Sequence, residues 1–511
     1  MTDSTTISPT TLSQPRFTAL AQVSAGTWSV VVIVLAFVIR VFAPLTTDTD
    51  WLMSNCRRFL DGAVLYKDII ETNPPMAIFM HLPAALVERW TGVPAEPVFT
   101  AMVFVAATGS AVFFSRCVQA VEPKLRLILP LTLAVLLIAP LSTFDEREQV
   151  ALILTLPLFG AAILRAYGQR IPWAMIVLTG LAAGMAPMIK PHFALGVAGA
   201  YIALALLQRR PWPLLSPEAV IAAVVTVAYG VATMVFMPAY GHDVLPLLFD
   251  LYRPMKKPFW YMLFLIPTLA WMAAVAGLWF ATRGRLLTPF NSVLLAASAG
   301  YLIGFIDQGR GWAYQMYPAL SLLMLVVFPA VPAALTSGQP TQRVPAVAAI
   351  IAVLSTLGYS TIFGAVGGGV IAPIQAVVAH PTMMSITFDL TPGHPIVTRT
   401  HGTWVGTFSS RWVTVNSAYL AHETKDPAKL AKYRQWQAYD RAVTNRDLAK
   451  RPDIVLVGIG PFNWPGWITR DPDTKRMMAD YVLLSEDRLS VQKRKDFEGV
   501  QAWIRRDLVK P

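Results

Sequence analysis

Five short stretches of this sequence gather charged and aromatic side chains between long apolar segments, and two of them supply carboxylates. Asp48 and Asp50 follow the first apolar segment, and Glu146 and Glu148 lie in the stretch FDEREQ (144–149). A carboxylate such as Asp48 suits a general base that deprotonates an attacking hydroxyl. Asp48 and Glu148 could alternatively bind a divalent cation through oxygen ligands. The sequence leaves both roles open.

The other three stretches supply cations. They are IKPHF (189–193), with Lys190 and His192; YRPMKK (252–257), with Arg253, Lys256 and Lys257; and IDQGRGWAYQMYP (306–318), with Arg310 and Tyr314. Arginine binds a phosphate through a bidentate fork and lysine through a point charge, so these side chains would suit a phosphate or diphosphate. A base that activates a nucleophile opposite such a phosphate leaving group is the layout expected for transfer of a sugar from a lipid phosphate.

Each of these stretches also has a purely structural interpretation. Asp50 is a candidate cap for a helix that starts at Trp51, because Asp is common at that position. Glu146, Arg147 and Glu148 are candidates for a loop network that neutralises itself. Structural roles for the remaining side chains are helix-end anchoring by snorkelling for Lys190 and His192, contact with lipid phosphates for YRPMKK, and an interfacial aromatic belt for Trp312, Tyr314 and Tyr317.

The composition indicates an integral membrane protein. Of 511 residues, 55% are hydrophobic and 14% are charged, against roughly 25% charged in soluble proteins. The net charge of +12 is not accompanied by a basic stripe with interleaved aromatic residues, so we expect no nucleic-acid partner. Many arginines lie instead in short loops between apolar runs, as the positive-inside rule predicts.

Apolar stretches long enough to approach the ~30 Å of a bilayer core predict about eleven membrane spans. They cover residues 28–43, 98–118, 125–141, 150–166, 173–189, 193–207, 219–237, 259–281, 292–306, 317–334 and 344–365. The apolar segment 76–90 carries His81 and Glu88 after two prolines, and it predicts an interfacial or half-inserted helix, with a full span as the alternative.

Loop charges predict the orientation of these spans. Alternate loops hold mainly Arg and Lys, for example Arg209 with Arg210 and Arg283 with Arg285, whereas the other set holds most of the acidic residues. This asymmetry predicts a cytoplasmic N-terminus and, with an odd number of spans, an extracytoplasmic C-terminus. All five polar stretches then fall at the extracytoplasmic face, where we expect them to form one site at the boundary of lipid and water.

The chain changes character near residue 367. The part from 367 to 511 holds 20 of the 42 Lys and Arg and 14 of the 30 Asp and Glu, which predicts a separate water-facing domain. Within it, 425–447 is typical of an amphipathic helix, 453–459 (DIVLVGI) of a buried strand, and 475–484 of another helix. The predicted fold is therefore mainly α, a polytopic membrane bundle (1–366) followed by a small extracytoplasmic α/β domain (367–511).

The first loop resembles the pattern of GT-C membrane glycosyltransferases that use dolichyl- or polyprenyl-phosphate sugars. An acidic residue after the first span, a helix leading to Gly and Tyr, and a Pro-Pro entry into an apolar helix correspond to Asp48, Gly62, Tyr66 and 74–75. FDEREQ, IKPHF and QGRGWAYQMYP are similar to bacterial family 39-like and aminoarabinose-transferase-like members. The resemblance covers about 28–365, and the tail is only generically similar.

The resemblance implies an inverting glycosyltransferase of a bacterial inner membrane, with a polyprenyl-phosphate sugar as donor and a glycolipid, polysaccharide or protein as extracytoplasmic acceptor. Asp48 would be the base, and Glu148 would support it or hold a metal. Lys190, His192 and Arg310 would bind the donor phosphate. The further residues expected to contact substrate are Asp50, Glu146, Arg147 and Tyr314. Membrane lipids are the remaining expected partner, and a divalent metal cation is the one cofactor that the residues suggest.

The sequence departs from the family pattern at two positions, and two other functions remain as alternatives. Asp48 is followed by Thr49 and then Asp50, where many members have Asp-Glu, so either aspartate is a candidate base, although the spacing to Gly62 favours Asp48. Gln315 stands where the family pattern leads us to expect a histidine. A flippase or transporter of lipid-linked sugars would predict ionisable groups in mid-span, but apart from Arg40 they lie at span ends. A non-catalytic membrane subunit is the third interpretation.

Overall fold

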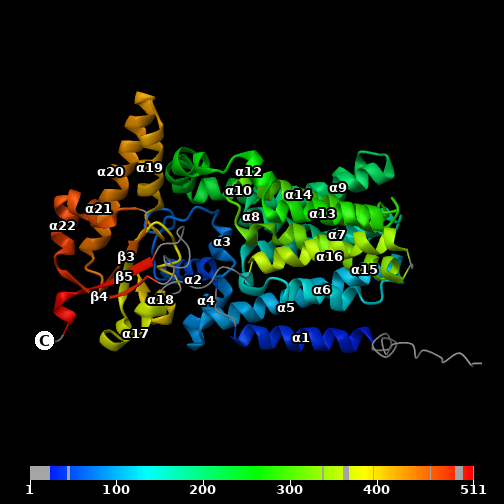
Figure 1. The fold of residues 1–511 in the computed structure, drawn as a ribbon, viewed down its shortest axis with the longest axis horizontal. Coiled ribbons are helices and arrows are strands. Elements are labelled where there is room, and N and C mark those ends of the chain that lie inside the picture. The colour runs from blue at the N-terminus through cyan, green and yellow to red at the C-terminus, as the bar shows by residue number, and fades with distance from the viewer. Residues whose placement is uncertain are drawn as a thin grey trace, which may run out of the picture.

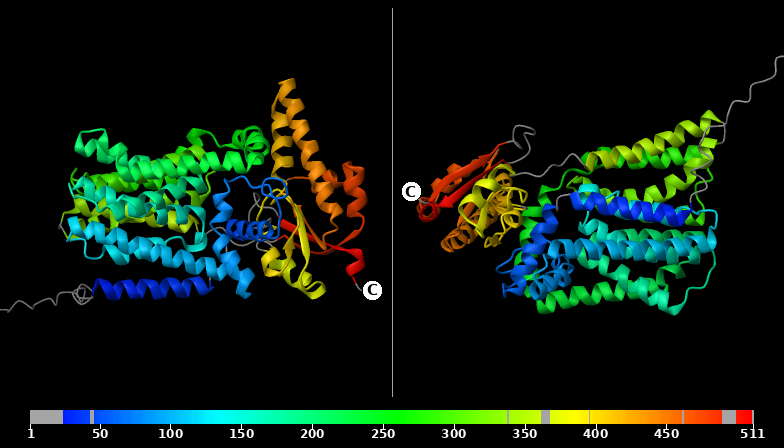
Figure 2. Two further views of the ribbon diagram at one scale, coloured as in Figure 1. Left: turned by 180° about the vertical axis from the view of Figure 1, so that it is seen from behind. Right: turned by 90° about the horizontal axis from the view of Figure 1, so that it is seen from below.

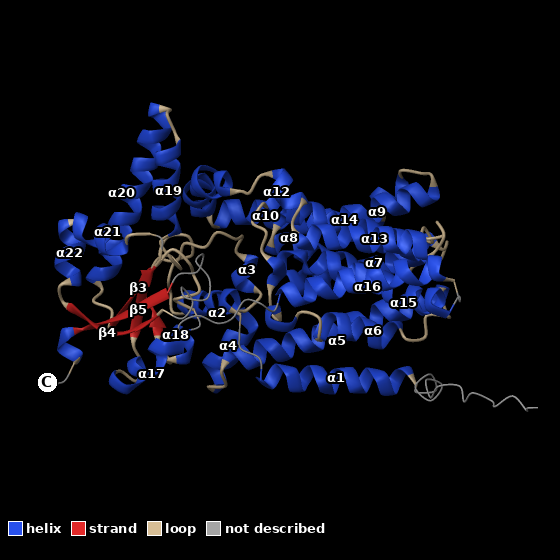
Figure 3. Ribbon diagram, in the orientation of Figure 1, coloured by secondary structure: helices blue, strands red, loops and turns tan. Residues whose placement is uncertain are grey.

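Long helices packed side by side form most of the molecule, and a smaller domain lies at one end of this bundle (Figure 1). The computed structural model describes residues 24–42, 46–336, 339–360, 368–394, 396–460, 462–488 and 499–509. Strands occur, among these residues, only in the smaller C-terminal domain (Figure 3). The predicted fold class is confirmed. The predicted domain boundary at 366/367 lies outside the described residues and stays a prediction.

The bundle contains a helix at each of the eleven positions predicted as spans. They are α1 (Ala25–Phe42), α5 (Ala95–Val121), α6 (Ile128–Leu137), α7 (Arg147–Ala166), α8 (Trp173–Ile189), α9 (Ala194–Gln208), α10 (Pro217–Phe236), α12 (Phe259–Leu263) with α13 (Ile266–Ala281), α14 (Pro289–Gln308), α15 (Tyr317–Thr336) and α16 (Pro340–Ser360). Among the described residues, seven segments are long and apolar enough to cross a membrane, and α6, α8, α13 and α16 are shorter apolar helices. The end of the last predicted span, 361–365, lies outside the described residues.

One predicted span is interrupted. The chain leaves helical geometry at Phe264 and Leu265, between α12 and α13. Pro267 lies in the first turn of α13, where its missing N–H costs nothing, but it would break a helix that continued through it.

The first loop is itself largely helical. α2 (Thr47–Leu60) is followed by two short helices, α3 (Met76–Phe79) and α4 (Leu82–Thr91). Ten residues of α-helix extend only about 15 Å, half of a bilayer core, so the full-span alternative for 76–90 is wrong. The two short helices lie between the bundle and the C-terminal domain (Figure 1).

The C-terminal domain is built on a mixed sheet of five strands. The strands are β1 (Thr382–Ile386), β2 (Thr403–Trp404), β3 (Ile454–Ile459), β4 (Tyr481–Asp487) and β5 (Gly499–Arg505). Their order is β2-β1-β3-β5-β4, in which β2, β1 and β3 are parallel and β5 runs antiparallel to both of its neighbours. Helices α17 (Gly368–Val377), α18 (Ile396–Arg399), α19 (Trp412–Glu423), α20 (Pro427–Ala449), α21 (Trp464–Arg470) and α22 (Pro472–Met478) surround it.

The central strand β3 is apolar throughout because both faces of the sheet are covered. Ile454 and Leu456 belong to a hydrophobic core that is continuous with the bundle, whereas Val455 and Val457 pack in a second core with Trp464. The predicted helix 475–484 is correct only as far as Met478, where α22 ends, and 481–487 is strand β4. Strand β4 gains backbone hydrogen bonds from the later strand β5, a non-local partner that helical periodicity does not reveal.

The C-terminal domain docks on two loops at one end of the bundle (Figure 2). Ile70 in the first loop donates its backbone N–H to Thr407 O at 2.9 Å, and Arg58 donates to Gly406 O at 2.8 Å. On the loop between α10 and α12, Asp250 accepts from Trp436 Nε1 at 3.0 Å and pairs with Lys432, also from α20, at 2.7 Å. The C-terminal domain therefore binds both loops through hydrogen bonds and an ion pair.

Candidate functional site

The N-terminus of α7 presents three buried charged side chains at the end of a membrane helix. Glu146 is the residue before the helix, and Arg147 and Glu148 lie in its first turn. All three are almost fully buried, with exposed fractions of 5%, 5% and 1%. The positive end of the helix dipole favours a carboxylate at Glu148. Arg147 forms an ion pair with Glu146 at 3.8 Å, as a self-neutralising network predicts. The hydrogen bonds of Arg147 and Glu148 instead lead to Asp48 and Lys190, so the three residues do not form that network by themselves.

Asp48 is the carboxylate that Arg147 holds. Asp48 lies in the first turn of α2, whose start is capped by Thr46, and its Oδ2 accepts a hydrogen bond from Arg147 Nη2. Among the described residues, Oδ1 accepts no hydrogen bond, and the side chain is 23% exposed. The result is an oriented carboxylate with one oxygen available to a proton donor.

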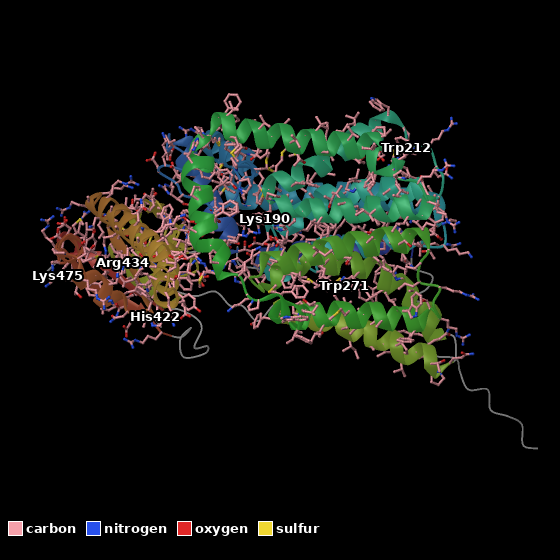
Figure 4. All side chains as sticks on the ribbon, turned by 90° about the horizontal axis from the view of Figure 1, so that it is seen from above. Lys190, Trp212, Trp271, His422, Arg434 and Lys475 are labelled. Carbon is pink, nitrogen blue, oxygen red and sulfur yellow. The ribbon has the colours of Figure 1, made fainter. Side chains whose placement is uncertain are left out.

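Lys190 supplies a second buried ion pair. It follows α8 and precedes a short 3₁₀ turn that begins at Pro191, which cannot continue the helix. Its Nζ donates to Glu148 Oε1 at 2.6 Å and lies 5.6 Å from the centre of the Tyr314 ring. Only 9% of the side chain is exposed, so Lys190 does not snorkel to water. Figure 4 shows Lys190 near the junction of the bundle and the C-terminal domain.

Tyr314 completes this group. Its hydroxyl lies within electrostatic reach of Asp48, Arg147 and Glu148, and its ring stacks on Trp312 with centroids 5.9 Å apart. Trp312 is 44% exposed, as an interfacial aromatic would be, whereas Tyr314 is partly covered and turned towards the charges. The belt interpretation therefore fits Trp312 better than Tyr314.

His192 borders the same charges without pairing. Lys190, Arg147 and Lys256 are its electrostatic neighbours, and its Nε2 is buried without a hydrogen-bond partner among the described residues. The ring packs against Gly304 of α14, where a Cβ would lie 3.3 Å from His192 Cδ2. A larger residue at 304 would push the imidazole out of place.

Among the described residues, Arg310 is connected to the group through Tyr252. Its guanidinium lies 3.5 Å from the centre of the Tyr252 ring and donates to the carbonyls of Tyr252 at 2.6 Å and Met255 at 3.3 Å. The charges of Asp48 and Arg147 act on the same tyrosine. Sequence reasoning placed Tyr252 in a cationic stretch but did not single it out; no local motif marks a tyrosine as a stacking partner of a distant arginine.

Asp50 lies apart from the other predicted site residues. It is fully buried, accepts a hydrogen bond from the Thr398 hydroxyl, and lies 3.8 Å from His394 Nδ1, both in the C-terminal domain. Burial raises its pKa to about 7. Helix α2 begins at Thr47 with Thr46 as its cap, so the prediction that Asp50 caps a helix from Trp51 is wrong.

Several buried polar atoms of the group have no hydrogen-bond partner among the described residues. They are Glu146 Oε2, Arg147 Nε, Glu148 Oε2, His192 Nε2, Arg310 Nε and Gln315 Oε1. Most buried polar atoms in proteins are paired, so such a concentration is unusual. It leaves both donors and acceptors for a polar substrate.

The carboxylates predicted as metal ligands are each paired with a cation, Asp48 with Arg147 and Glu148 with Lys190. In the described part of the chain, no cluster of three or more His, Cys, Asp and Glu side chains is placed to hold a metal ion. A divalent cation at Asp48 and Glu148 stays a prediction to which this geometry gives no support.

Comparisons with known proteins find likeness in structure alone. No family model and no curated protein sequence matches the chain. The structure of ArnT from Cupriavidus metallidurans bound to undecaprenyl phosphate superposes with a TM-score of 0.53 at 15% identity, over 96% of this chain and 100% of that one. The apo structure of the same ArnT gives 0.52 at 15% identity, over 95% and 99%. The protein therefore has the fold of ArnT over nearly its whole length.

Proposed function

We propose that this protein is a membrane glycosyltransferase that moves a sugar from a polyprenyl-phosphate donor to an extracytoplasmic acceptor, with inversion at the anomeric carbon. The observation that carries the proposal is the unsaturated charged cluster of Asp48, Arg147, Glu148, Lys190 and Tyr314 at the end of an apolar bundle. The fold of an ArnT that binds undecaprenyl phosphate supports it.

The proposed site for the donor phosphate consists of Lys190 from the cluster and two further groups, Arg310 and His192. Lys190 has one carboxylate partner and keeps further N–H donors, and the buried Arg310 Nε is unpaired among the described residues. His192 Nε2 is a third available group. Charge-assisted contacts of this kind stabilise the negative charge that grows on a departing lipid phosphate.

Asp48 is the proposed base. Its unpaired oxygen accepts the proton of an acceptor hydroxyl while that oxygen attacks the anomeric carbon from the face opposite the phosphate. The bond between the anomeric carbon and the phosphate oxygen breaks, and the polyprenyl phosphate leaves with the electron pair. Arg147 orients Asp48 through its hydrogen bond to Oδ2, and Glu148 positions Lys190.

The same proposal places the protein in a bacterial inner membrane, with its N-terminus cytoplasmic and its C-terminal domain outside. The loops around the cluster are those to which the C-terminal domain binds, through Thr407 on Ile70 and Trp436 on Asp250. We infer that this domain shapes the site from the aqueous side, where a lipid, polysaccharide or protein acceptor arrives.

Transfer by purified protein from synthetic undecaprenyl-phosphate sugars to a panel of acceptors tests the proposal. Asp48→Asn should abolish transfer, with a loss of about a thousandfold or more, because no base remains. Asp50→Asn is the matched control, an identical change two residues away that faces the C-terminal domain, and it should keep most of the activity. Near-normal transfer by Asp48→Asn would contradict the assignment, and movement of intact donor without cleavage would indicate a transporter.

A further inference from the structure

A cavity at the end of the bundle away from the charged cluster has no role in the proposed reaction. It has a volume of about 630 Å³ and is lined by the ends of α7 and α9 and the turn before α10, including Arg165, Gln208, Arg210, Trp212 and Leu215. Arg165 follows Arg147 along α7 by 18 residues, which corresponds to about 27 Å of helix. Figure 4 shows Trp212 far from Lys190, at the opposite end of the bundle.

The wall of the cavity carries a positive charge, that of Arg210, which no carboxylate among the described residues neutralises. The buried Glu218, next to the lining residue Pro217, pairs with Arg165 through two contacts of 2.5 and 2.8 Å and also accepts from Tyr201 at 3.0 Å. Arg210, in contrast, has no ion-pair partner within the described residues. The amide of Gln208 adds a polar group to the same wall. An anion is therefore the ligand that this wall would attract.

The rim of the cavity is apolar. Trp212 and Leu215 are 71% and 65% exposed, and they lie in a turn directly before α10, a helix whose outward valines are also exposed. Apolar side chains and a tryptophan in this setting belong at the boundary between acyl chains and headgroups. A small soluble anion would make no use of them.

We propose that this cavity binds the headgroup of an anionic phospholipid, with Arg210 on the phosphate and Trp212 and Leu215 against the acyl chains. Basic pockets between membrane helices suit such headgroups, and the predicted orientation places this one in the cytoplasmic leaflet. A second cavity of about 520 Å³ at the same end of the bundle repeats the pairing of arginine and aromatic residues, with Arg283, Trp279 and Phe280. The site is distinct from the donor site because a whole membrane helix separates them.

Binding of phosphatidylglycerol to delipidated, detergent-solubilised full-length protein tests this site. Native mass spectrometry and thermal unfolding would be recorded with added phosphatidylglycerol, phosphatidylcholine and inorganic phosphate. Arg210→Gln should weaken phosphatidylglycerol binding about tenfold, the effect of losing one charge-assisted contact. Arg209→Gln is the matched control, because Arg209 is exposed like Arg210 but does not line the cavity, and it should change binding less than about twofold.

Each alternative outcome overturns the proposal. Equal weakening by Arg209→Gln would mean diffuse attraction to surface charge. Binding of phosphatidylcholine as strong as that of phosphatidylglycerol would show that the site does not select an anionic headgroup. Equal stabilisation by inorganic phosphate would indicate that the ligand is a soluble anion. The readout is binding, so the result does not depend on whether the protein transfers a sugar.

Discussion

Two buried arginines, one in each part of the molecule, differ in how completely their hydrogen-bonding groups and those of their acidic partners are paired. In the C-terminal domain, Arg411 is fully buried and donates to Asp440 at 3.2 Å and to Asp447 at 3.3 Å. The other oxygen of each aspartate accepts a hydroxyl hydrogen bond, from Thr414 for Asp440 and from Thr407 for Asp447. The backbone N–H of Thr407 also donates to the Asp447 oxygen that Arg411 binds. The network is closed.

In the charged cluster at the end of the membrane bundle, Arg147 makes one side-chain hydrogen bond to another described residue, Asp48. Its Nε is buried without a partner in the described part of the chain. One oxygen of Glu148 accepts from Lys190, and the other has no hydrogen-bond partner among the described residues. Burying charge without saturating it is costly, and the cost is justified where a substrate supplies the missing contacts. The comparison therefore teaches that a closed network holds a domain together, whereas an open one marks a site.

The closed network should give the largest loss of stability. Arg411→Met leaves Asp440 and Asp447 buried with less compensation, and we expect the free energy of unfolding of the C-terminal domain to fall by about 3–5 kcal/mol. Limited proteolysis and fluorescence-monitored thermal unfolding of the full-length protein would measure this. Arg476→Met, at an exposed ion pair with Asp473, should cost less than about 1 kcal/mol. Similar losses in both variants would erase the distinction.

The open cluster should lose activity rather than stability. The double variant Lys190→Gln, Glu148→Gln replaces the ion pair by two amides of similar size, so thermal stability should change by less than about 1 kcal/mol. Transfer should fall about a hundredfold, because the cation that we propose for the donor phosphate is gone. Steady-state kinetics with varied donor concentration would measure both kcat and KM.

Glu148→Gln alone keeps the cation and should lower transfer less than the double variant does. Loss of thermal stability as large as in Arg411→Met would show that the Lys190 pair is structural. Equal transfer activity in the double variant and the parent would show that Lys190 does not bind the donor phosphate.

Asp50, at the contact between the two regions, should make stability depend on pH. The folded-state pKa of about 7 exceeds the roughly 3.9 of an unfolded aspartate, so the folded protein binds the proton more tightly. The stabilisation is complete below about pH 4 and is lost as the pH rises through about 7. The charged and titratable groups around the carboxyl are Arg57, Glu96, His394 and Arg399.

Asp50→Asn, which stays neutral, should therefore unfold at a higher temperature than the parent above about pH 7, by a few degrees, and lose this advantage towards about pH 4. Thermal unfolding of both proteins between about pH 5 and pH 8 would show it. Asp61→Asn, on the exposed end of α2, should leave the pH dependence unchanged. An advantage of Asp50→Asn that did not change with pH would contradict the buried-carboxyl explanation.

Much of the fold was predictable because local sequence determines it. Helix α8 has the predicted limits, 173–189, since its apolar run is bounded by Pro172 before it and Lys190 after it. The site was predictable in part, because the polar stretches lie at the ends of such helices. The partners of Asp50 were not, since Thr398 is 348 residues away and the tail carries no motif that points to it. Residues 481–487 likewise became a strand through pairing with β5.

The smallest effect should come from Lys256, which lies at the edge of the open cluster. It pairs with Asp307 at 3.1 Å, with 32% and 70% of the two side chains exposed, so Lys256→Gln should cost less than about 1 kcal/mol of stability. Its charge acts on His192, and we expect transfer to fall a few-fold, less at high salt because exposed charges are screened. Kinetics at low and high ionic strength would measure this. Asp307→Asn is the control: it removes the partner of Lys256 but keeps the lysine charge, so transfer should not slow. If both variants slow transfer alike, the ion pair supports the loop at Gly309, against which Lys256 packs. The open cluster would then end at His192.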